Sequence, residues 1–312
     1  MKIRQIQLSP YDFTYAHGYR RLGALIKVEN EDGNHGEGDL APLPERSSES
    51  LFQAIAQLEE YKALLSSIEW DRAAFLEQLA GLSLLPSLAF ALESVLFSLF
   101  TPLFSCSLEV AALLMGNSLR QILDIAEARK KEGFTIAKLK ISNLSREDAS
   151  TAIHELKGMF TLRIDVNSRW ALSDSIRFFS QFPIEIFDYI EDPTKSLKEL
   201  GQFPYPIAVE AAISKGVSLS LLETIPTLKA ITYKPTVQGG YLVGKQFKRW
   251  ADERGISLVL SSSLESDVGH FHLAVVAGRL GLTAPIGIGT YQYLNQHLAE
   301  RKLNFTKGRV II

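Results

Sequence analysis

The sequence predicts an α/β protein: a (β/α)8-type barrel, in a modified (β/α)7β form, with an N-terminal α+β capping domain. The main observation is a series of five short apolar runs, each ending in a charged residue, at intervals of 25, 26, 19 and 24 residues. A strand, a turn, a helix and a return loop need about that many residues, so the spacing indicates consecutive βα units. The charged residues that end the runs are Lys140, Asp165, Glu191, Glu210 and Lys234.

The first third of the chain has the pattern of a β-meander followed by helices. A turn is expected at 31–34, where Asp-Gly is followed by Asn. The polar and aromatic segment 10–21 is expected to be a loop, and loops of that length are often functional. A helix capped by Ser47 or Ser48 should follow the Gly- and Pro-rich stretch. The expected strands are 2–8, about 22–29 and about 35–39, and the later helices are 71–79 and 87–100.

From about residue 106 the pattern changes to alternating strands and helices, which implies a parallel sheet. Seven or more repeats over about 180 residues imply that this sheet closes into a barrel. We therefore divide the chain into a capping domain over 1–105 and a catalytic barrel over 106–290. The tail, 291–312, is expected to return to the capping domain and to end in a strand.

The composition is that of a globular protein and excludes several classes. The net charge of −2, without a basic block, argues against nucleic acid as a partner. The single cysteine, Cys106, excludes an internal disulfide and a cysteine-rich metal site. Pro86, Glu93 and Pro102 interrupt the apolar stretch 82–108, so no uncharged run reaches the roughly 18 residues of a membrane span. With no signal peptide visible, we expect a cytoplasmic protein.

The charged strand ends should meet at one opening, because the C-terminal ends of barrel strands form the active-site face. Alternation along a strand places Lys138 on the same face as Lys140, and Arg163 and Asn167 on the same face as Asp165. A single such residue is readily explained as a surface charge or a structural ion pair, but five in register are not. Three neighbouring carboxylates cannot all stay ionised without a compensating charge, and a divalent cation is the simplest one.

These residue types favour metal-assisted proton abstraction. The three acids offer only oxygen ligands, which favours a hard cation, Mg²⁺, over zinc. Mg²⁺ held in this way keeps positions open for a substrate carboxylate and can stabilise an enediolate as a proton leaves the adjacent carbon. A lysine close to a metal and to a second lysine should have a lowered pKa, as a general base requires. Lys140 and Lys234 could reach opposite faces of a small carboxylate substrate.

These motifs resemble the enolase superfamily, in its muconate-lactonising-enzyme-like subgroup, and within it the o-succinylbenzoate synthase family. The resemblance covers nearly the whole chain. Its motifs are the KxK pattern Lys138–Lys140, Asp165 with Asn167, Glu191-Asp192-Pro193, Glu210 and Lys234-Pro235. The stretches GEGDLAPLP, PSLAFALESVLFSL, RIDVN, YKPTVQGG and SSSLESDVG are similar to further blocks of that family.

The resemblance implies a Mg²⁺-dependent lyase that dehydrates 2-succinyl-6-hydroxy-2,4-cyclohexadiene-1-carboxylate to 2-succinylbenzoate in menaquinone biosynthesis. It implies that Lys140 removes the proton next to the carboxylate and that Lys234 stays charged and stabilises the enediolate. It also implies that segment 10–21 closes over the ligand. The metal ligands that it implies are Asp165, Glu191 and Glu210. The substrate-binding residues that it implies are Lys138, Arg163, Asn167, Ser262 and Ser263.

The chain departs from the family pattern at one point. The third metal ligand is commonly followed by Glu in an Asp-Glu-Ser context, whereas Glu210 is followed by Ala211-Ala212. This places the surroundings of the third ligand in doubt. Asp192 is read equally as a neighbour of the metal ligands or as a residue near a helix start.

Two alternative functions stay open on the sequence. Racemisation of N-acylamino acids or epimerisation of dipeptides would use the same two lysines, one on each face of the substrate. An Asp-x-Asp motif marks dipeptide epimerases, and Gly287-Ile288-Gly289 stands here instead. A non-catalytic barrel that only binds an acidic ligand would have no need of two candidate bases. The oligomeric state is open between a monomer and a homodimer.

The histidines show no ligand-like spacing, and a structural or surface role is expected for His270 and His272. His17 lies in the expected lid segment and is a candidate for contact with the substrate.

Overall fold

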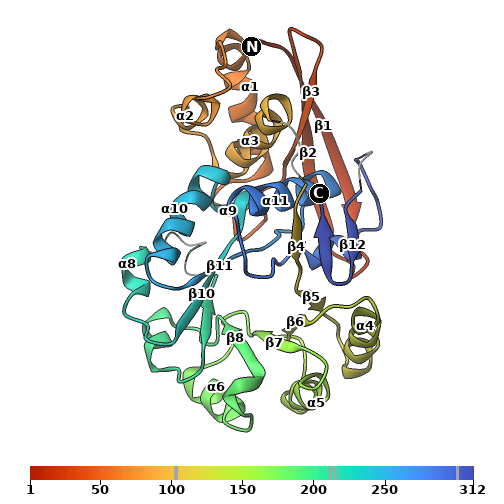
Figure 1. The fold of residues 1–312 in the computed structure, drawn as a ribbon, viewed down its shortest axis with the longest axis vertical. Helices are drawn as coiled ribbons and strands as arrows, with labels where there is room; N and C mark the ends of the chain where they lie inside the picture. The colour runs from red at the N-terminus through yellow and green to blue at the C-terminus, as the bar shows by residue number, and fades with distance from the viewer. Residues whose placement is uncertain (102–104, 211–212, 214–215, 217, 300–301) are drawn as a thin grey trace.

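The computed structural model describes residues 1–101, 105–210, 213, 216, 218–299 and 302–312. Its chain forms an N-terminal block of sheet and helices above a curled parallel sheet surrounded by helices (Figure 1). The N-terminal sheet is antiparallel, in the order β1-β2-β3, with strands Ile3–Thr14, Arg20–Asn30 and His35–Leu40. The helices of this block are α1 (Leu51–Ser67), α2 (Phe75–Ala80) and α3 (Pro86–Phe100).

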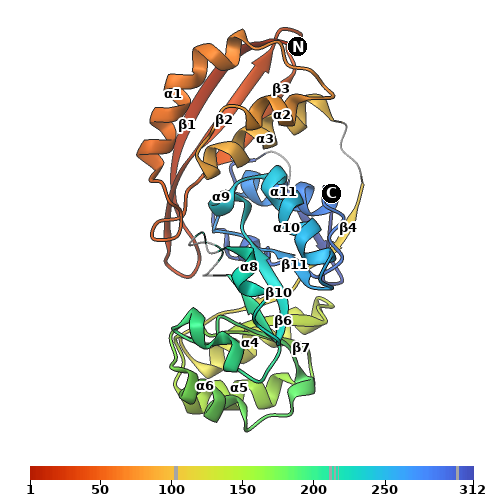
Figure 2. The ribbon, with the colours of Figure 1, turned by 90° about the vertical axis from the view of Figure 1, so that its left-hand side faces the viewer.

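The prediction of a loop over 10–21 is wrong for most of that segment. Strand β1 continues to Thr14 and β2 begins at Arg20, so that only 15–19 connects them. Aromatic side chains at alternate positions, among them Phe13 and Tyr15, are buried on one side of this extension, which suits a strand better than a loop. Pro10 is tolerated because β1 is an edge strand. The result is a long hairpin arm that reaches down beside the barrel (Figure 2).

Helix starts in the N-terminal block follow local capping chemistry. Ser50, and not the expected Ser47 or Ser48, caps α1, because Gln53 three residues later completes a capping box with it. The expected turn after β2 is confirmed: the Asn30 side-chain oxygen accepts hydrogen bonds from the backbone of Asp32 and Asn34. Apolar residues of the sheet and of all three helices form one hydrophobic core.

The parallel sheet confirms the predicted barrel class. Its strands follow the order β11-β10-β9-β8-β7-β6-β5, and neighbours pair in parallel. Two single-residue bridges, Val110 with Ile286 and Ser261 with Gly287, link the two edges of the sheet through one short segment. The strands are β5 (Ala112–Leu114), β6 (Ile136–Lys140), β7 (Thr161–Asp165), β8 (Phe187–Glu191), β9 (Ile207–Val209), β10 (Leu228–Tyr233) and β11 (Ser257–Leu260).

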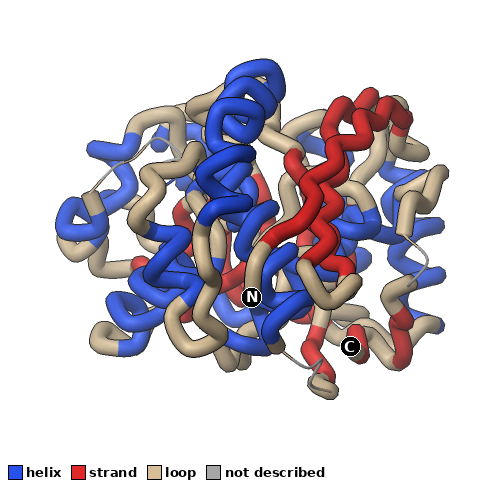
Figure 3. Tube along the Cα trace, turned by 90° about the horizontal axis from the view of Figure 1, so that it is seen from above, coloured by secondary structure: helices blue, strands red, loops and turns tan. Residues whose placement is uncertain are grey.

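Helices surround this sheet, as the view from above shows (Figure 3). Ser118 and Ser145 cap α4 and α5 with their side chains, whereas Ala171 precedes α6 in place of a capping side chain. The helices are α4 (Leu119–Lys131), α5 (Arg146–Leu156), α6 (Leu172–Phe179), α8 (Leu219–Leu222), α9 (Pro235–Gln238), α10 (Tyr241–Asp252) and α11 (Asp267–Arg279). Short 3-10 turns are η1 (Ile184–Ile186), η2 (Leu197–Gln202) and η3 (Gly289–Tyr293).

The segment that enters the barrel forms two short strands. Strand β4 (Ser107–Glu109) leaves the barrel sheet and pairs with the end of the chain, and β5 alone joins the barrel. The tail forms a hairpin of β12 (Asn304–Thr306) and β13 (Arg309–Ile311), and β13 pairs with β4 and not with the N-terminal sheet. The tail strand is therefore confirmed, and it pairs with β4. The domain boundary near residue 105 and the return of 291–312 to the capping domain stay predictions.

Buried polar side chains fasten the N-terminal block to the barrel. The Glu93 carboxylate, from α3, accepts hydrogen bonds from the backbone N–H groups of Tyr241 and Leu242 at the start of α10. Asp39 accepts hydrogen bonds of 2.8 Å from the backbone and hydroxyl of Ser266, which caps α11. Each carboxylate thus satisfies donors that a helix start leaves unpaired.

Among the described residues, no helix is both long and apolar enough to cross a membrane.

Candidate active site

The five strand-end residues lie together at the C-terminal edge of the parallel sheet. Pairing of β6, β7 and β8 sets Lys140 beside Asp165 and Asp165 beside Glu191. Glu210 follows β9 directly, and Lys234 follows β10 and begins α9. The three carboxylates are almost completely buried, with 2–4% of each residue exposed. Burial of so much charge requires close opposite charges or a metal ion.

Two lysines supply part of that compensating charge. Lys138 Nζ lies 3.1 Å from Asp165 Oδ2 and 2.6 Å from Glu191 Oε1. Lys234 Nζ lies 3.1 Å from Glu210 Oε2. Burial alone would lower the pKa of Lys138, but the carboxylates of Asp165 and Glu191 outweigh it and hold that pKa well above its ordinary value. Lys138 is therefore a fixed positive charge and not a candidate base.

Lys140 has the opposite electrostatic balance. Its pKa is lowered, chiefly by burial and also by the positive charges of Lys138 and Lys234, although Asp165 opposes the shift. A lowered pKa makes the neutral amine accessible at moderate pH, as a general base requires. The KxK motif thus places two lysines on one face of β6 with different protonation behaviour, because Lys138 sits between two carboxylates and Lys140 does not.

The carboxylates that could share one metal ion are Glu191, Asp192 and Glu210, whose oxygen atoms lie within 4.8 Å of one another. Asp165, expected from sequence as a ligand, is outside this group and is paired with Lys138. Asp192 enters the group because its backbone adopts a left-handed conformation, with φ 45°, directly after β8. Burial and the negative charges of Glu191 and Glu210 raise the pKa of Asp192 to about 7.

This donor set fits a hard divalent cation. All the ligand atoms are carboxylate oxygens, and nitrogen or sulfur ligands are absent from the group. Thr232 Oγ1 donates a hydrogen bond of 3.2 Å to Glu191, and the Glu210 backbone N–H donates one of 3.1 Å to Asp192. These contacts hold two of the carboxylates in place from behind, as outer partners commonly do at metal sites. Ala211 and Ala212, which depart from the family pattern, lie outside the described residues.

Sequence reasoning missed one cation at the site. Arg46, from the segment after β3, reaches across to the barrel and its Nη1 lies 3.6 Å from Glu210 Oε2. Its position could not be inferred from spacing, because the contact joins residues 164 positions apart in different blocks. The N-terminal block therefore contributes a positive charge to the carboxylate cluster.

A cavity of about 60 Å³ opens between the lysines and the loop after β11. It is lined in part by Lys140, Asn167, Lys234, Ser262 and Thr290. Neither Arg163 nor Ser263 is among the described residues that line it. Arg163 Nε donates to Asp188 at 2.8 Å and Nη1 donates to the Pro285 carbonyl, which explains why it is turned away. Asn167 lies just past β7 with φ 54°, and its backbone N–H donates to Asp165.

The tip of the hairpin arm lies close to this cavity. The backbone N–H of Ala16 donates to the Tyr293 carbonyl at 2.8 Å, and the Tyr15 hydroxyl donates to the Glu265 carbonyl at 2.5 Å. The His17 ring stacks on Tyr15 with a centroid distance of 5.3 Å. Burial and the nearby charge of Lys140 lower the pKa of His17. The arm therefore brings an imidazole into the electrostatic range of the candidate base.

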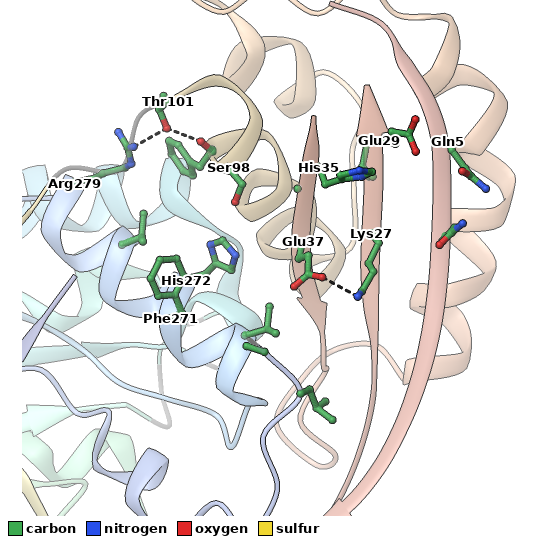
Figure 4. A pocket seen from close by; sticks show the side chains of 18 residues that line it. Gln5, Lys27, Glu29, His35, Glu37, Ser98, Thr101, Phe271, His272 and Arg279 are labelled. Carbon is green, nitrogen blue, oxygen red and sulfur yellow. Dashed lines mark hydrogen bonds and ion pairs between the residues drawn. The ribbon is translucent and has the colours of Figure 1, made fainter. Parts of the chain in front are cut away.

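A larger cavity, of about 930 Å³, lies elsewhere, between the polar face of the N-terminal sheet and α11 (Figure 4). Its sheet wall carries two acids, and both are paired: Glu37 with Lys27 at 2.9 Å and Glu29 with Arg4 at 3.2 Å. Its helix wall includes Phe271 and His272 (Figure 4). Because the described residues that line it contain no cluster of unpaired acids and bases, we place the chemistry at the smaller cavity, where perturbed groups converge.

The model of the family described as "Enolase C-terminal domain-like" matches residues 121–312, more than half of the chain. The chain belongs to this family. Among curated relatives, the o-succinylbenzoate synthase of Edwardsiella ictaluri (strain 93-146) is 27% identical over 285 residues, which cover 89% of this chain and 85% of the relative. The corresponding synthase of Yersinia pseudotuberculosis serotype I is 27% identical over 288 residues, or 90% and 85% of the two chains.

Solved structures of the superfamily share the whole fold. The L-Ala-D/L-Glu epimerase from Bacillus subtilis has a TM-score of 0.83 at 18% identity and covers 99% of this chain and 96% of its own. The muconate lactonizing enzyme from Pseudomonas putida has a TM-score of 0.81 at 20% identity, with coverage of 100% and 94%. MenC from Desulfotalea psychrophila LSv54 has a TM-score of 0.76 at 20% identity, and both chains are covered completely.

These findings confirm the predicted relationship to o-succinylbenzoate synthases and the predicted enzyme, a lyase of the enolase superfamily. At 16–20% identity the structural neighbours report on fold alone, and they include epimerases as well as a MenC protein. The reaction, the substrate and the roles of single residues therefore rest on the site.

Proposed function

We propose that this enolase-superfamily lyase dehydrates 2-succinyl-6-hydroxy-2,4-cyclohexadiene-1-carboxylate to 2-succinylbenzoate, as its curated relatives are named to do. The observation that carries the proposal is the pair of half-buried lysines, Lys140 and Lys234, at the ends of strands separated by three others in the sheet, beside a cluster of carboxylates. Removal of a proton next to a carboxylate requires a base on one side of the substrate and a positive charge on the other, with oxygen ligands for a metal between them.

The proposed roles rest on the lowered pKa of Lys140 and on the ion pair of Lys234 with Glu210. Neutral Lys140 accepts the proton from the carbon next to the substrate carboxylate, and Lys234 stays charged and offsets the negative charge that develops on the carboxylate oxygens. The carbon–oxygen bond to the ring hydroxyl then breaks, a ring double bond forms, and the Lys140 ammonium returns its proton to the departing hydroxyl, which leaves as water. Both steps occur on one face of the ring, so the elimination is syn. The net change is loss of one water.

Mg²⁺, when bound, would supply Lewis-acid stabilisation of the same carboxylate oxygens. Glu191 and Glu210 would hold it, with Asp192 as the third carboxylate of the described cluster. Asp165 remains a proposed ligand, and it could turn to the ion only after exchanging its contact with Lys138. Lys138 would stay paired with Glu191 at 2.6 Å, and it lines the cavity, which is consistent with its proposed contact with the substrate.

The remaining proposed contacts concern the distal end of the substrate. Ser262 and Asn167 both line the cavity, Ser262 from the segment after β11 and Asn167 from the segment after β7. A cavity of about 60 Å³ is far smaller than the 300–1,000 Å³ of a typical ligand site, and we propose that the arm tip at 15–19 moves when the substrate enters. The proposed lid is therefore the connection 15–19, which is shorter than the segment 10–21 expected from the sequence. We still expect the substrate to be a small-molecule carboxylate and the enzyme to be cytoplasmic.

The diene chromophore of the substrate provides a direct test. Purified protein with Mg²⁺ should abolish the diene absorbance, and the reaction should need both the metal and Lys140. Exchange of the α-proton of N-acylamino acids or dipeptides, with the diene left intact, would favour the racemase or epimerase alternative, which uses the same two lysines. Absence of both reactions would favour a barrel that only binds a ligand.

A further inference from the structure

A chain of hydrogen bonds links the candidate cavity to a buried histidine. His270 Nδ1 lies 2.9 Å from the Ser266 carbonyl oxygen, and His270 Nε2 lies 2.7 Å from Thr290 Oγ1. Thr290 Oγ1 in turn is hydrogen-bonded to Ser262 Oγ. Ser262 and Thr290 line the cavity, whereas His270 is completely buried behind them. The chain therefore runs from a carbonyl on α11 to a hydroxyl at the site.

The proton positions along this chain are fixed by its first contact. A carbonyl oxygen can only accept, so Nδ1 carries the proton of the neutral imidazole and Nε2 presents a lone pair. Thr290 has one hydroxyl proton, which must point to Nε2, because two lone pairs would otherwise face each other at 2.7 Å. The contact between Thr290 and Ser262 then needs the proton of Ser262, which is thereby directed away from its other acceptor, the Gly287 carbonyl at 3.3 Å. With a neutral His270, Ser262 thus presents lone pairs to the cavity.

That arrangement conflicts with an anionic ligand. A substrate carboxylate at Ser262 is an acceptor and would meet an oxygen that has no proton to donate. If His270 carries a second proton, the chain reverses: Nε2 donates to Thr290, Thr290 donates to Ser262, and Ser262 donates to the carboxylate. The one proton gained comes from solvent, and no bond other than the O–H and N–H bonds changes.

We propose that His270 and Thr290 are positioning residues that set the hydrogen-bond polarity of Ser262, and that a carboxylate reaching Ser262 binds with uptake of one proton by His270. The identity of this carboxylate, the distal one of the substrate, rests on the proposed function. The coupling itself follows from the contacts and applies to any carboxylate that reaches Ser262. Sequence reasoning assigned His270 a structural role because its partners come from segments 262–266 and 289–293, which are joined only in the fold.

The surroundings of His270 allow both charge states. Burial lowers its pKa and favours the neutral ring in the absence of a ligand, while the negative charges of Glu265 and Asp267 oppose that shift. The Tyr291 ring packs against the imidazole at 5.6 Å. Five titratable groups lie near the imidazole or near the residues that contact it. They are Asp39, Glu265, Asp267, Tyr291 and His297. A ligand carboxylate would add one more negative charge at the other end of the chain and favour the imidazolium.

Thr290→Val and Thr290→Ser form a matched pair for the test. Valine has the shape of threonine without the hydroxyl, so it interrupts the chain and leaves His270 and Ser262 in place; serine keeps the hydroxyl. In ligand-free protein, nitrogen NMR of the imidazoles should show His270 as the neutral tautomer with the proton on Nδ1. This first measurement is independent of the reaction that the protein catalyses.

The second measurement is calorimetric titration of the Mg²⁺-loaded protein with 2-succinylbenzoate in buffers of different ionisation enthalpy. We expect uptake of about one proton near pH 7.5 for the wild type and for Thr290→Ser, and none for Thr290→Val. In turnover of the diene, Thr290→Val should raise KM about tenfold, with a smaller change in kcat, because a charge-assisted hydrogen bond to the ground-state ligand is lost. The wild-type KM should rise with pH, and this dependence should disappear in Thr290→Val.

Three results would overturn the proposal: an Nε2–H tautomer, no proton uptake by the wild type, or uptake that Thr290→Val retains. If the diene is not turned over, the same titration is made with N-succinylmethionine, an N-acylamino acid that carries a second carboxylate distal to its α-carbon. Proton uptake that depends on Thr290 would then support the chain of hydrogen bonds and exclude only the proposed dehydratase activity. If neither ligand binds, the tautomer of His270 decides alone.

Discussion

Glu93 gives a quantitative prediction about how the N-terminal block is attached to the barrel. Only 3% of this residue is exposed, and its carboxylate accepts the backbone N–H groups that begin α10. Burial raises its pKa from 4.5 to about 7, although the two hydrogen bonds work in the opposite direction. The folded protein therefore holds a proton on Glu93 over a pH range in which the unfolded chain has lost it.

The sign of the pH dependence follows from that difference. Below about pH 4.5 Glu93 is protonated in both the folded and the unfolded state, so its ionisation does not change the free energy of unfolding. Between about pH 4.5 and 7 Glu93 ionises in the unfolded state only, so the unfolded state is progressively favoured. Above that range the folded state bears the full cost. At about 1.4 kcal/mol for each pKa unit, the free energy of unfolding falls by about 3 kcal/mol across the window.

Glu93→Gln isolates this contribution, because glutamine keeps an oxygen acceptor for the two N–H groups and does not titrate. We expect the variant and the wild type to have the same free energy of unfolding near pH 4.5, measured by denaturant titration. Near pH 8 the free energy of unfolding of the variant should be higher by up to about 3 kcal/mol. Glu60→Gln, at an exposed position of α1, is the control and should change neither value. A Glu93→Gln variant that is less stable than the wild type near pH 8 would show that the ionised carboxylate at the start of α10 stabilises the fold, and the reasoning would be refuted.

Two further substitutions test the attachment of α10 and the metal site. Gly240→Ala should destabilise the protein by about 2 kcal/mol or more in thermal unfolding, because its Cβ would overlap the Glu93 carboxylate; an unchanged midpoint would contradict this close approach. Asp192→Asn should weaken Mg²⁺ binding about tenfold or more in calorimetric titration, since it removes one of three clustered carboxylates. Affinity that depends on Asp165 and not on Asp192 would restore the ligand set expected from sequence.

The spacing of charged strand ends was enough to predict the barrel and the meeting of Lys140, Asp165, Glu191, Glu210 and Lys234 at one edge. Period-two alternation and the length of a βα unit are local properties, so they can be read along one chain. The same logic failed at the arm, where aromatic residues and a proline were read as a loop although β1 is an edge strand that tolerates Pro10.

What the sequence could not supply are contacts between blocks and conformations at strand ends. Arg46 meets Glu210 only because the segment after β3 folds over the barrel. Asp192 joins the carboxylate cluster through a left-handed backbone conformation that no spacing rule indicates. Arg163 shares a strand face with Asp165, but its long side chain turns toward Asp188, because that carboxylate lies closer to its level in the sheet.

The measurement that tests the central claim most directly is diene loss with Mg²⁺, made with the wild type, with Lys140→Ala and with Lys130→Ala, an exposed lysine on α4, as the control. We predict metal-dependent loss of absorbance by the wild type and the control, and a decrease of about 10²-fold or more for Lys140→Ala. Turnover by Lys140→Ala at the wild-type rate, or turnover that persists after removal of the metal with EDTA, would contradict the proposed chemistry.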